Sequence, residues 1–215
     1  MSGAGPVGQD GAMSFFDDLP RRPEPPENDV PERSLPEWLG PPRDVMGGVV
    51  PVAELVVRTA QVFVGLRAVT AYPTGLSLSL ALVVRRGELP RERWQALEAS
   101  FWADPPLRRG AIPSEGALRL GVELADGRRT GTLDRSGLRP DSSPEPPVLI
   151  EQSGGGSGGA RTMDRRVDLW LWPLPEGEFF SLVLQWPDLE IPVTAHRVDL
   201  EPVRAAAQRA MPFWP

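Results

Sequence analysis

The sequence predicts a mainly β protein: an antiparallel β-sandwich of about eight or nine strands, with two packed helices and a disordered N-terminal tail. Three observations support this fold class. From residue 46 onward, apolar residues recur at every second position, which is typical of strands. The connections between these runs are predominantly of hairpin length, which favours antiparallel pairing over parallel βαβ units. Residues 1–45, in contrast, contain nine of the 26 prolines.

Residues 1–45 are expected to form a disordered, acidic, proline-rich tail, and residues 46–215 a single β-sandwich domain. Nine Asp or Glu and four Arg give the tail a charge of −5, whereas 20 acidic residues and 19 Arg leave the rest of the chain at −1. Sequence of this kind buries too little apolar surface to offset its ordering entropy. No signal peptide is visible, and Met13 is a second candidate start.

One segment of the tail has helical spacing. Leu35, Trp38 and Leu39 fall on one face of a single turn, and Pro36 suits the first positions of that turn. The segment has two interpretations. It is a strap that packs on the protein's own domain, or it is a short helical motif that docks in a groove of a partner protein.

The strands are predicted from alternation of apolar and polar residues. Tyr72-Pro73-Thr74-Gly75 supplies turn chemistry between the second and third strands, and Asp126-Gly127 turns the fourth back into the fifth. The predicted strands are 49–58, 61–68, 76–84, 118–124, 128–133, 147–152, 167–172, 179–186 and 190–198.

Two helices are expected to pack on the strands. The first, Pro90–Trp102, has large apolar side chains on one face and a proline at its start. The second, about 201–211, has a narrow stripe of small residues, which allow close approach to a sheet. After it, Phe213 and Trp214 are expected to anchor the C-terminus on the domain.

Composition excludes most catalytic classes. The chain has no cysteine and no lysine, so it offers no thiolate, disulfide, Schiff base or Walker lysine. His196 is the single histidine, and Asp168 or Glu178 orients it only if their strands neighbour the last one. Ser153 or Ser181 would then be the nucleophile, yet no G-x-S-x-G elbow exists. We therefore assign no catalytic, cofactor-binding or metal-ligating residue, and lean against an enzyme.

Two further features have alternative interpretations. Trp170 and Trp172 share the side of their strand that carries Asp168; they are either packing units or a partly exposed binding patch. The glycine-rich segment 153–159 is either an anion cradle followed by arginines or a flexible hairpin connector. It lacks the G-x-x-x-x-G-K-[ST] pattern and no clear helix follows it, which favours the connector.

Three strings also carry a resemblance: AYPTGLSLSL, SGGGSGGARTMDRRVDLWLWPLPEGEFFSLVLQWP and AAAQRAMPFWP. They resemble a family of uncharacterised actinobacterial proteins with a YPTG turn, a glycine-rich loop, a WLWPLP strand and a C-terminal helix. The resemblance covers most of residues 46–215. It implies one natural domain, and it implies no activity and no catalytic residue.

These observations favour a non-catalytic protein-interaction or accessory module in the cytoplasm. Its expected contacts are Leu35, Trp38, Leu39, Trp170 and Trp172, and its expected partner is a protein. The near-neutral domain is no template for nucleic acid, and no run of about 20 apolar residues suggests a membrane span. Two alternatives stay open: a carboxylate-based carbohydrate-active or hydrolytic enzyme, and a sandwich that binds a small ligand between its sheets.

Overall fold

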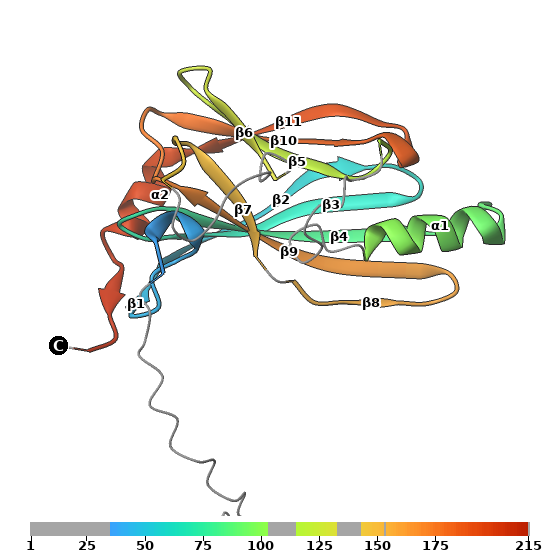
Figure 1. The fold of residues 1–215 in the computed structure, drawn as a ribbon, viewed down its shortest axis with the longest axis horizontal. Helices are drawn as coiled ribbons and strands as arrows, with labels where there is room; N and C mark the ends of the chain where they lie inside the picture. The colour runs from blue at the N-terminus through green and yellow to red at the C-terminus, as the bar shows by residue number, and fades with distance from the viewer. Residues whose placement is uncertain (1–34, 103–114, 133–142, 153, 215) are drawn as a thin grey trace, which may run out of the picture. The chain divides into compact units, whose positions relative to one another are not determined.

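Two antiparallel sheets form most of the fold (Figure 1). The computed structural model describes residues 35–102, 115–132, 143–152 and 154–214. The larger sheet has the order β2–β3–β4–β9–β7, with β8 paired to β9, and the smaller sheet has the order β11–β10–β5–β6. The strands are β2 (Gly48–Arg58), β3 (Val62–Ala71), β4 (Leu76–Arg85), β5 (Arg119–Leu124), β6 (Arg129–Gly131), β7 (Val148–Gln152), β8 (Gly156–Gly158), β9 (Thr162–Trp172), β10 (Phe179–Trp186) and β11 (Ile191–Asp199).

The mainly β, antiparallel class predicted from the sequence is confirmed. All nine predicted strands are present, and the described residues hold three more: β8, β1 (Val45–Met46) and β12 (Met211–Pro212). Strands of two or three residues are too short to show an alternating pattern, so periodicity did not reveal them. β1 and β12 pair with each other as a separate two-stranded ribbon.

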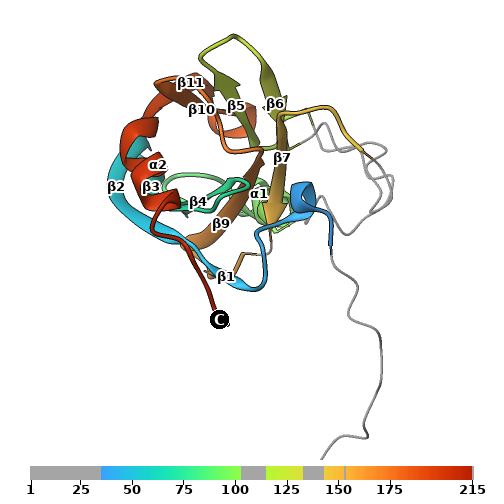
Figure 2. The same cartoon turned by 90° about the vertical axis from the view of Figure 1, so that its left-hand side faces the viewer.

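The two sheets approach each other at both edges. β2 lies beside β11, and β6 lies beside β7 (Figure 2). Within the described ranges no ladder of backbone hydrogen bonds joins either pair, so the sheets do not close into a barrel. The arrangement is a sandwich whose edges lie close together without strand pairing.

The first helix, α1 (Arg91–Phe101), forms where the sequence predicts it. Pro90 precedes its first residue, and its buried side chains are Trp94, Leu97 and Phe101. Phe101 stacks on Trp186 of β10 with ring centroids 5.9 Å apart. The helix therefore contributes its apolar face to the main core.

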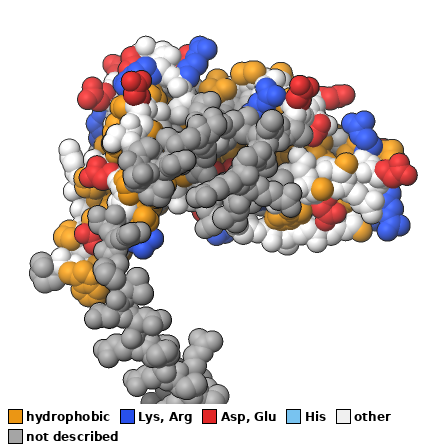
Figure 3. Space-filling model, in the orientation of Figure 1, with side chains coloured by type: hydrophobic (Ala, Val, Ile, Leu, Met, Phe, Trp, Pro, Cys, Tyr) orange, Lys and Arg blue, Asp and Glu red, His pale blue; other side chains and the backbone are white. Residues whose placement is uncertain are grey.

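The second helix, α2 (Leu200–Ala207), is shorter than predicted, because the chain leaves the helix and extends into β12. The predicted anchoring of the C-terminus on the domain is wrong. Phe213 is 51% exposed and Trp214 is 77% exposed. Hydrophobic side chains gather at the lower left of Figure 3, where the C-terminal strand lies. The described residues at this end of the domain thus form an apolar surface and are not buried.

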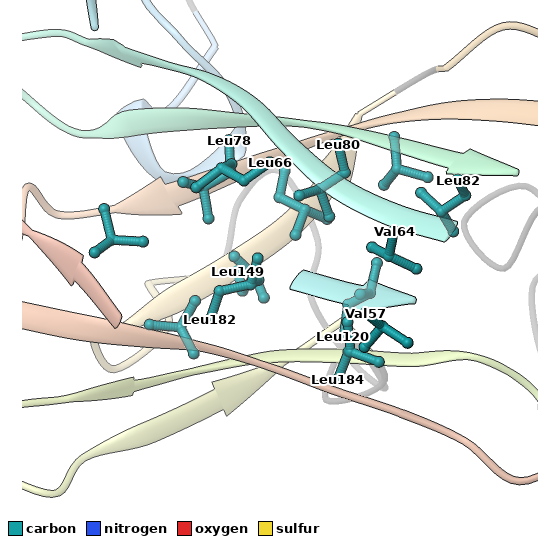
Figure 4. Close-up of a cluster of buried hydrophobic side chains, with 14 of the residues drawn as sticks. Val57, Val64, Leu66, Leu78, Leu80, Leu82, Leu120, Leu149, Leu182 and Leu184 are labelled. Carbon is teal, nitrogen blue, oxygen red and sulfur yellow. The ribbon is translucent and has the colours of Figure 1, made fainter. Parts of the chain in front are cut away.

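The core fills the space between the two sheets (Figure 4). Alternate residues of β4 point inward and are fully buried from Leu76 to Val84. They meet the side chains of Leu120, Leu182 and Leu184 from the smaller sheet. Each fully buried Leu stabilises the fold by about 1.5–3 kcal/mol relative to an exposed one. This packing explains why the period-two pattern was so strong in these strands.

Gly48 is a position where α2 crosses β2 very closely. A Cβ atom there would lie 1.9 Å from the backbone oxygen of Ala206 in α2. Because a backbone atom cannot rotate away, we expect Gly48→Ala to lower the free energy of unfolding by about 1–3 kcal/mol. Urea unfolding measures this change. Gly155→Ala is the matched control, since no atom lies within 4 Å of its Cβ position; equal stability of the two variants would contradict the close crossing.

Candidate functional site

The Trp38 segment packs on its own domain. It forms one turn of 3-10 helix, η1 (Glu37–Leu39), and Trp38 is only 5% exposed. Two side chains hold the turn in place. Trp170 Nε1 donates a hydrogen bond to the backbone oxygen of Glu37 at 3.0 Å, and Gln152 Nε2 donates one to the backbone oxygen of Leu39 at 3.1 Å. This is the geometry of the strap interpretation, because a docking motif would have to leave Trp38 free.

The domain begins earlier in the sequence than predicted, because it includes this Trp38 segment, which we call the strap (residues 35–39). The compact unit that contains both sheets begins at Leu35, so residues 35–45 belong to it and not to the tail predicted over 1–45. Leu35 itself is 45% exposed and Leu39 is partly buried. Residues 1–34 lie outside the described part of the chain.

The expected exposed pair of tryptophans is not present. Trp170 has no exposed surface, and Trp172 is partly buried. Trp170 lies on the outer side of β9, where Trp38, Val148 and Ile150 cover it in a second, smaller apolar cluster. The other side of β9 faces the main core, so the strand is buried on both faces from Leu169 to Leu171. The sequence pattern predicted the alternation in β9, but it did not show that the Trp38 segment covers Trp170.

The YPTG turn is shaped by this second cluster. Tyr72 meets Trp170 edge to face, with ring centroids 5.6 Å apart, and partial burial raises the pKa of the Tyr72 phenol above its ordinary value. Gly75 closes the turn through the hydrogen bond from the Tyr72 N–H to its oxygen. A Cβ atom at Gly75 would come within 2.6 Å of the Trp170 ring. The motif therefore has a packing role.

The glycine-rich segment forms a hairpin, as the connector interpretation predicts. Its residues 156–158 form β8, which pairs with β9. Gly154 and Gly156 approach the β9 backbone so closely that a Cβ would lie 1.7 and 2.1 Å from carbonyl oxygens. Arg165, one of the arginines that follow, forms an ion pair with Glu151 and donates a hydrogen bond to the backbone oxygen of Phe101. The glycines thus serve close packing, and Ser153 lies outside the described residues.

His196 is bound to a residue that the sequence did not suggest. Its Nε2 lies 2.7 Å from the Glu54 Oε2, so the contact joins β11 to β2 across the edge of the sandwich. Asp168 instead accepts a hydrogen bond from the Ser79 hydroxyl. Among the described residues the hydrogen-bonding partner of His196 is a carboxylate, and no hydroxyl nucleophile completes a triad.

A groove lies on the outer face of the larger sheet, with a volume of about 540 Å³. Small residues form its floor, and two arginines, one carboxylate and one aromatic ring line it. The lining residues are Ala53, Glu54, Leu55, Arg58, Phe63, Gly65, Arg67, Ala68 and Ser79. A glycosidase needs two carboxylates, whereas this lining provides one. No sequence motif pointed to the groove, because bulges in β2 create it.

A second surface lies where β1 pairs with β12. We call β1, β12 and residues 213–214 the terminal ribbon. Met46 is directly opposite Met211, and the Phe213 N–H donates to the Asp44 oxygen, so strand alternation puts Met46, Met211 and Phe213 on one face. All three side chains are about half exposed, and Trp214 is more exposed still. The charge-free ending of the sequence was the signal that could have revealed this surface.

Comparisons with protein-family models, with curated proteins and with solved structures find no match. The resemblance to an actinobacterial family stays a prediction. In the part of the chain that the structure describes, no helix combines the length and apolar character that a bilayer crossing requires. The same residues contain no group of three or more His, Asp or Glu side chains placed to hold a metal ion.

Proposed function

We propose that the protein is a non-catalytic protein-interaction module whose contact surface is the terminal ribbon. One observation carries the proposal: the ribbon exposes Met46, Met211, Phe213 and Trp214 together, whereas Trp38 and Trp170 are buried in the second apolar cluster. Isolated exposed apolar residues are ordinary on a protein surface, but a group of four on one small ribbon is a feature of interaction sites.

The chemistry of these side chains suits an anchor in a partner protein. Trp, Phe and Met are enriched at the centres of interfaces, and a few such side chains supply most of the binding energy. Residues 210–214 carry no charged side chain, so burying their side chains against a partner desolvates no charged side chain of the ribbon. The proposed partner is therefore a protein with an apolar pocket or groove.

The rest of the molecule supports a binding role over catalysis. Side chains fill the interior between the two sheets. The hypothesis of a small ligand bound between the sheets is therefore not supported. The groove offers one carboxylate, and His196 contacts Glu54. The domain is nearly neutral in charge, so neither nucleic acid nor an anionic membrane surface is the proposed partner. The cytoplasm is the proposed location.

Photo-crosslinking in the native cell tests the proposal. A photoreactive phenylalanine analogue replaces Met211 in the full chain, and cross-linked proteins are identified with and without Phe213→Ser and Trp214→Ser. We expect one defined partner to be cross-linked by the wild-type ribbon and lost from the double variant. Val193→Ser is the matched control, because Val193 is 65% exposed on β11, outside the ribbon. The same cross-links in all variants, or none in any, would refute the proposal.

A further inference from the structure

We propose that the groove on the outer face of the larger sheet binds an extended acidic peptide segment of a partner protein. In this segment two carboxylates four residues apart meet Arg67 and Arg58, and a small apolar side chain midway between them contacts the floor of the groove. The proposal is independent of the terminal ribbon, since it depends on different residues and a different kind of contact.

The groove exists because β2 departs from regular pairing. Its register with β3 shifts between Pro51 and Glu54 and again between Leu55 and Val57, and Ala53 adopts a positive φ of 53°. Bulges of this kind bend a strand and open its ladder, and they are common next to binding sites. Beside the bent β2, Arg67 is exposed and Ala68 is partly exposed on β3, whereas Gly65 is buried.

The floor of the groove consists of the Phe63 ring and of small residues beside it. Gly65 is buried, because the Phe63 ring lies over it so closely that a Cβ atom at Gly65 would come within 2.9 Å of the ring. Ala68 and Ser79 are paired neighbours on β3 and β4 and continue the floor. An extended peptide with a small apolar side chain fits such a surface, whereas a regular sheet face with large residues would exclude it.

The charges that line the groove favour an anion. Arg58 and Arg67 are both exposed, and neither belongs to an ion pair between described residues. The Arg58 guanidinium lies 5.9 Å from the centre of the Phe63 ring, which holds it over the groove. The single carboxylate of the lining, Glu54, contacts His196. Two guanidinium groups thus remain free to form charge-assisted hydrogen bonds with carboxylates.

The spacing of the arginines selects an extended peptide rather than a single small anion. Arg58 pairs with Phe63 in the ladder, and Arg67 follows Phe63 by four residues along β3, at a register shift between Leu66 and Ala68. At about 3.3 Å per residue, less the irregularity, Phe63 and Arg67 are roughly 10–13 Å apart along β3. Arg58 lies beside Phe63 on the next strand, so one phosphate or sulfate cannot span both arginine positions. In an extended peptide, residues i, i+2 and i+4 point to the same side at the same spacing. The predicted motif is therefore acid–x–apolar–x–acid.

The test is a binding titration on the full-length chain. The probe is the fluorescein-labelled peptide Gly-Ser-Glu-Thr-Val-Thr-Glu-Ser-Gly, and its control has Gln in place of both Glu residues. Fluorescence anisotropy is measured at low and at high salt. We expect saturable binding of the Glu peptide, at least tenfold weaker binding of the Gln peptide, and weaker binding at high salt because the contacts are ionic.

Variants of the protein localise the binding. Arg58→Gln and Arg67→Gln are each expected to weaken binding by about fivefold or more, because each removes one charge-assisted contact. Arg91→Gln, an exposed arginine at the start of α1, is the matched control and should bind like the wild type. Far-ultraviolet circular dichroism verifies that each variant is folded.

Three results would overturn the inference: no saturable binding of the Glu peptide, equal binding of the Gln peptide, or unchanged affinity of both arginine variants. Tighter binding of a ten-nucleotide oligothymidylate than of the peptide would also overturn it in favour of nucleic acid. The ribbon variant with Phe213→Ser and Trp214→Ser should bind the peptide normally. Failure of the groove and failure of the ribbon are therefore distinguishable.

Discussion

Replacing Trp170 by alanine is expected to lower the free energy of unfolding by about 3–5 kcal/mol. The side chain is completely buried on the outer face of β9. Its loss leaves a cavity between Trp38 and Ile150, removes the edge-to-face contact with Tyr72, and leaves the Glu37 oxygen without its hydrogen bond from the indole. All three effects act in the same direction, so the variant tests whether the strap contributes to the stability of the domain.

Urea unfolding, followed by far-ultraviolet circular dichroism, measures the Trp170→Ala effect. Trp214→Ala is the matched control, because that side chain is mostly exposed and its removal should change the stability by about 0.5 kcal/mol or less. Trp170→Ala should also make the Trp38 segment more susceptible to proteolysis. A loss of less than about 1 kcal/mol with an unchanged proteolytic pattern would show that the segment does not pack on β9.

Replacing Arg165 by methionine is expected to be nearly as severe. Arg165 forms an ion pair with Glu151, and it also donates a hydrogen bond to the Phe101 oxygen at the end of α1. Both side chains of the pair are largely buried. The variant keeps the apolar stem of the side chain but removes the guanidinium group that pairs with the largely buried Glu151 carboxylate. Breaking a buried ion pair in this way typically costs about 3–5 kcal/mol.

A double-mutant cycle distinguishes this mechanism from simple loss of packing. Arg165→Met and Glu151→Leu are made singly and together, and each free energy of unfolding is measured in urea. We expect the double variant to recover most of the stability lost by Arg165→Met, since the carboxylate that lost its guanidinium partner is removed as well. Arg129→Met, which breaks an exposed pair with Glu123, should cost about 1 kcal/mol or less. Strictly additive effects of the two changes would contradict the coupling.

The strands that could be predicted are those with one face in the main core. β4 and β10 lie within one residue of their predicted bounds, because their inward residues alternate with smaller or polar ones. β9 was predicted only over 167–172, whereas it begins at Thr162. Its first half carries Asp164 and Arg165 in place of large apolar residues, so the alternation weakens where the strand pairs with the glycine-rich β8.

The candidate sites depend on contacts that no local pattern encodes. His196 and Glu54 are 142 positions apart, and their contact depends on which strands lie at the sheet edges. The groove depends on bulges in β2, each of which changes the register that alternation assumes. Trp170 was placed on the correct strand but assigned to an exposed surface, because the strap that covers it comes from the predicted tail.

The terminal ribbon joins strands that are about 165 residues apart, yet it consists of two paired residues on each strand and one further backbone hydrogen bond. So few bonds give it a low free energy of local opening, while the two sheets remain folded. The proposed contact surface therefore has its own opening equilibrium, separate from global unfolding. A partner that holds the ribbon closed would slow hydrogen exchange at the amides of Met46 and Phe213 and leave exchange in the core strands unchanged.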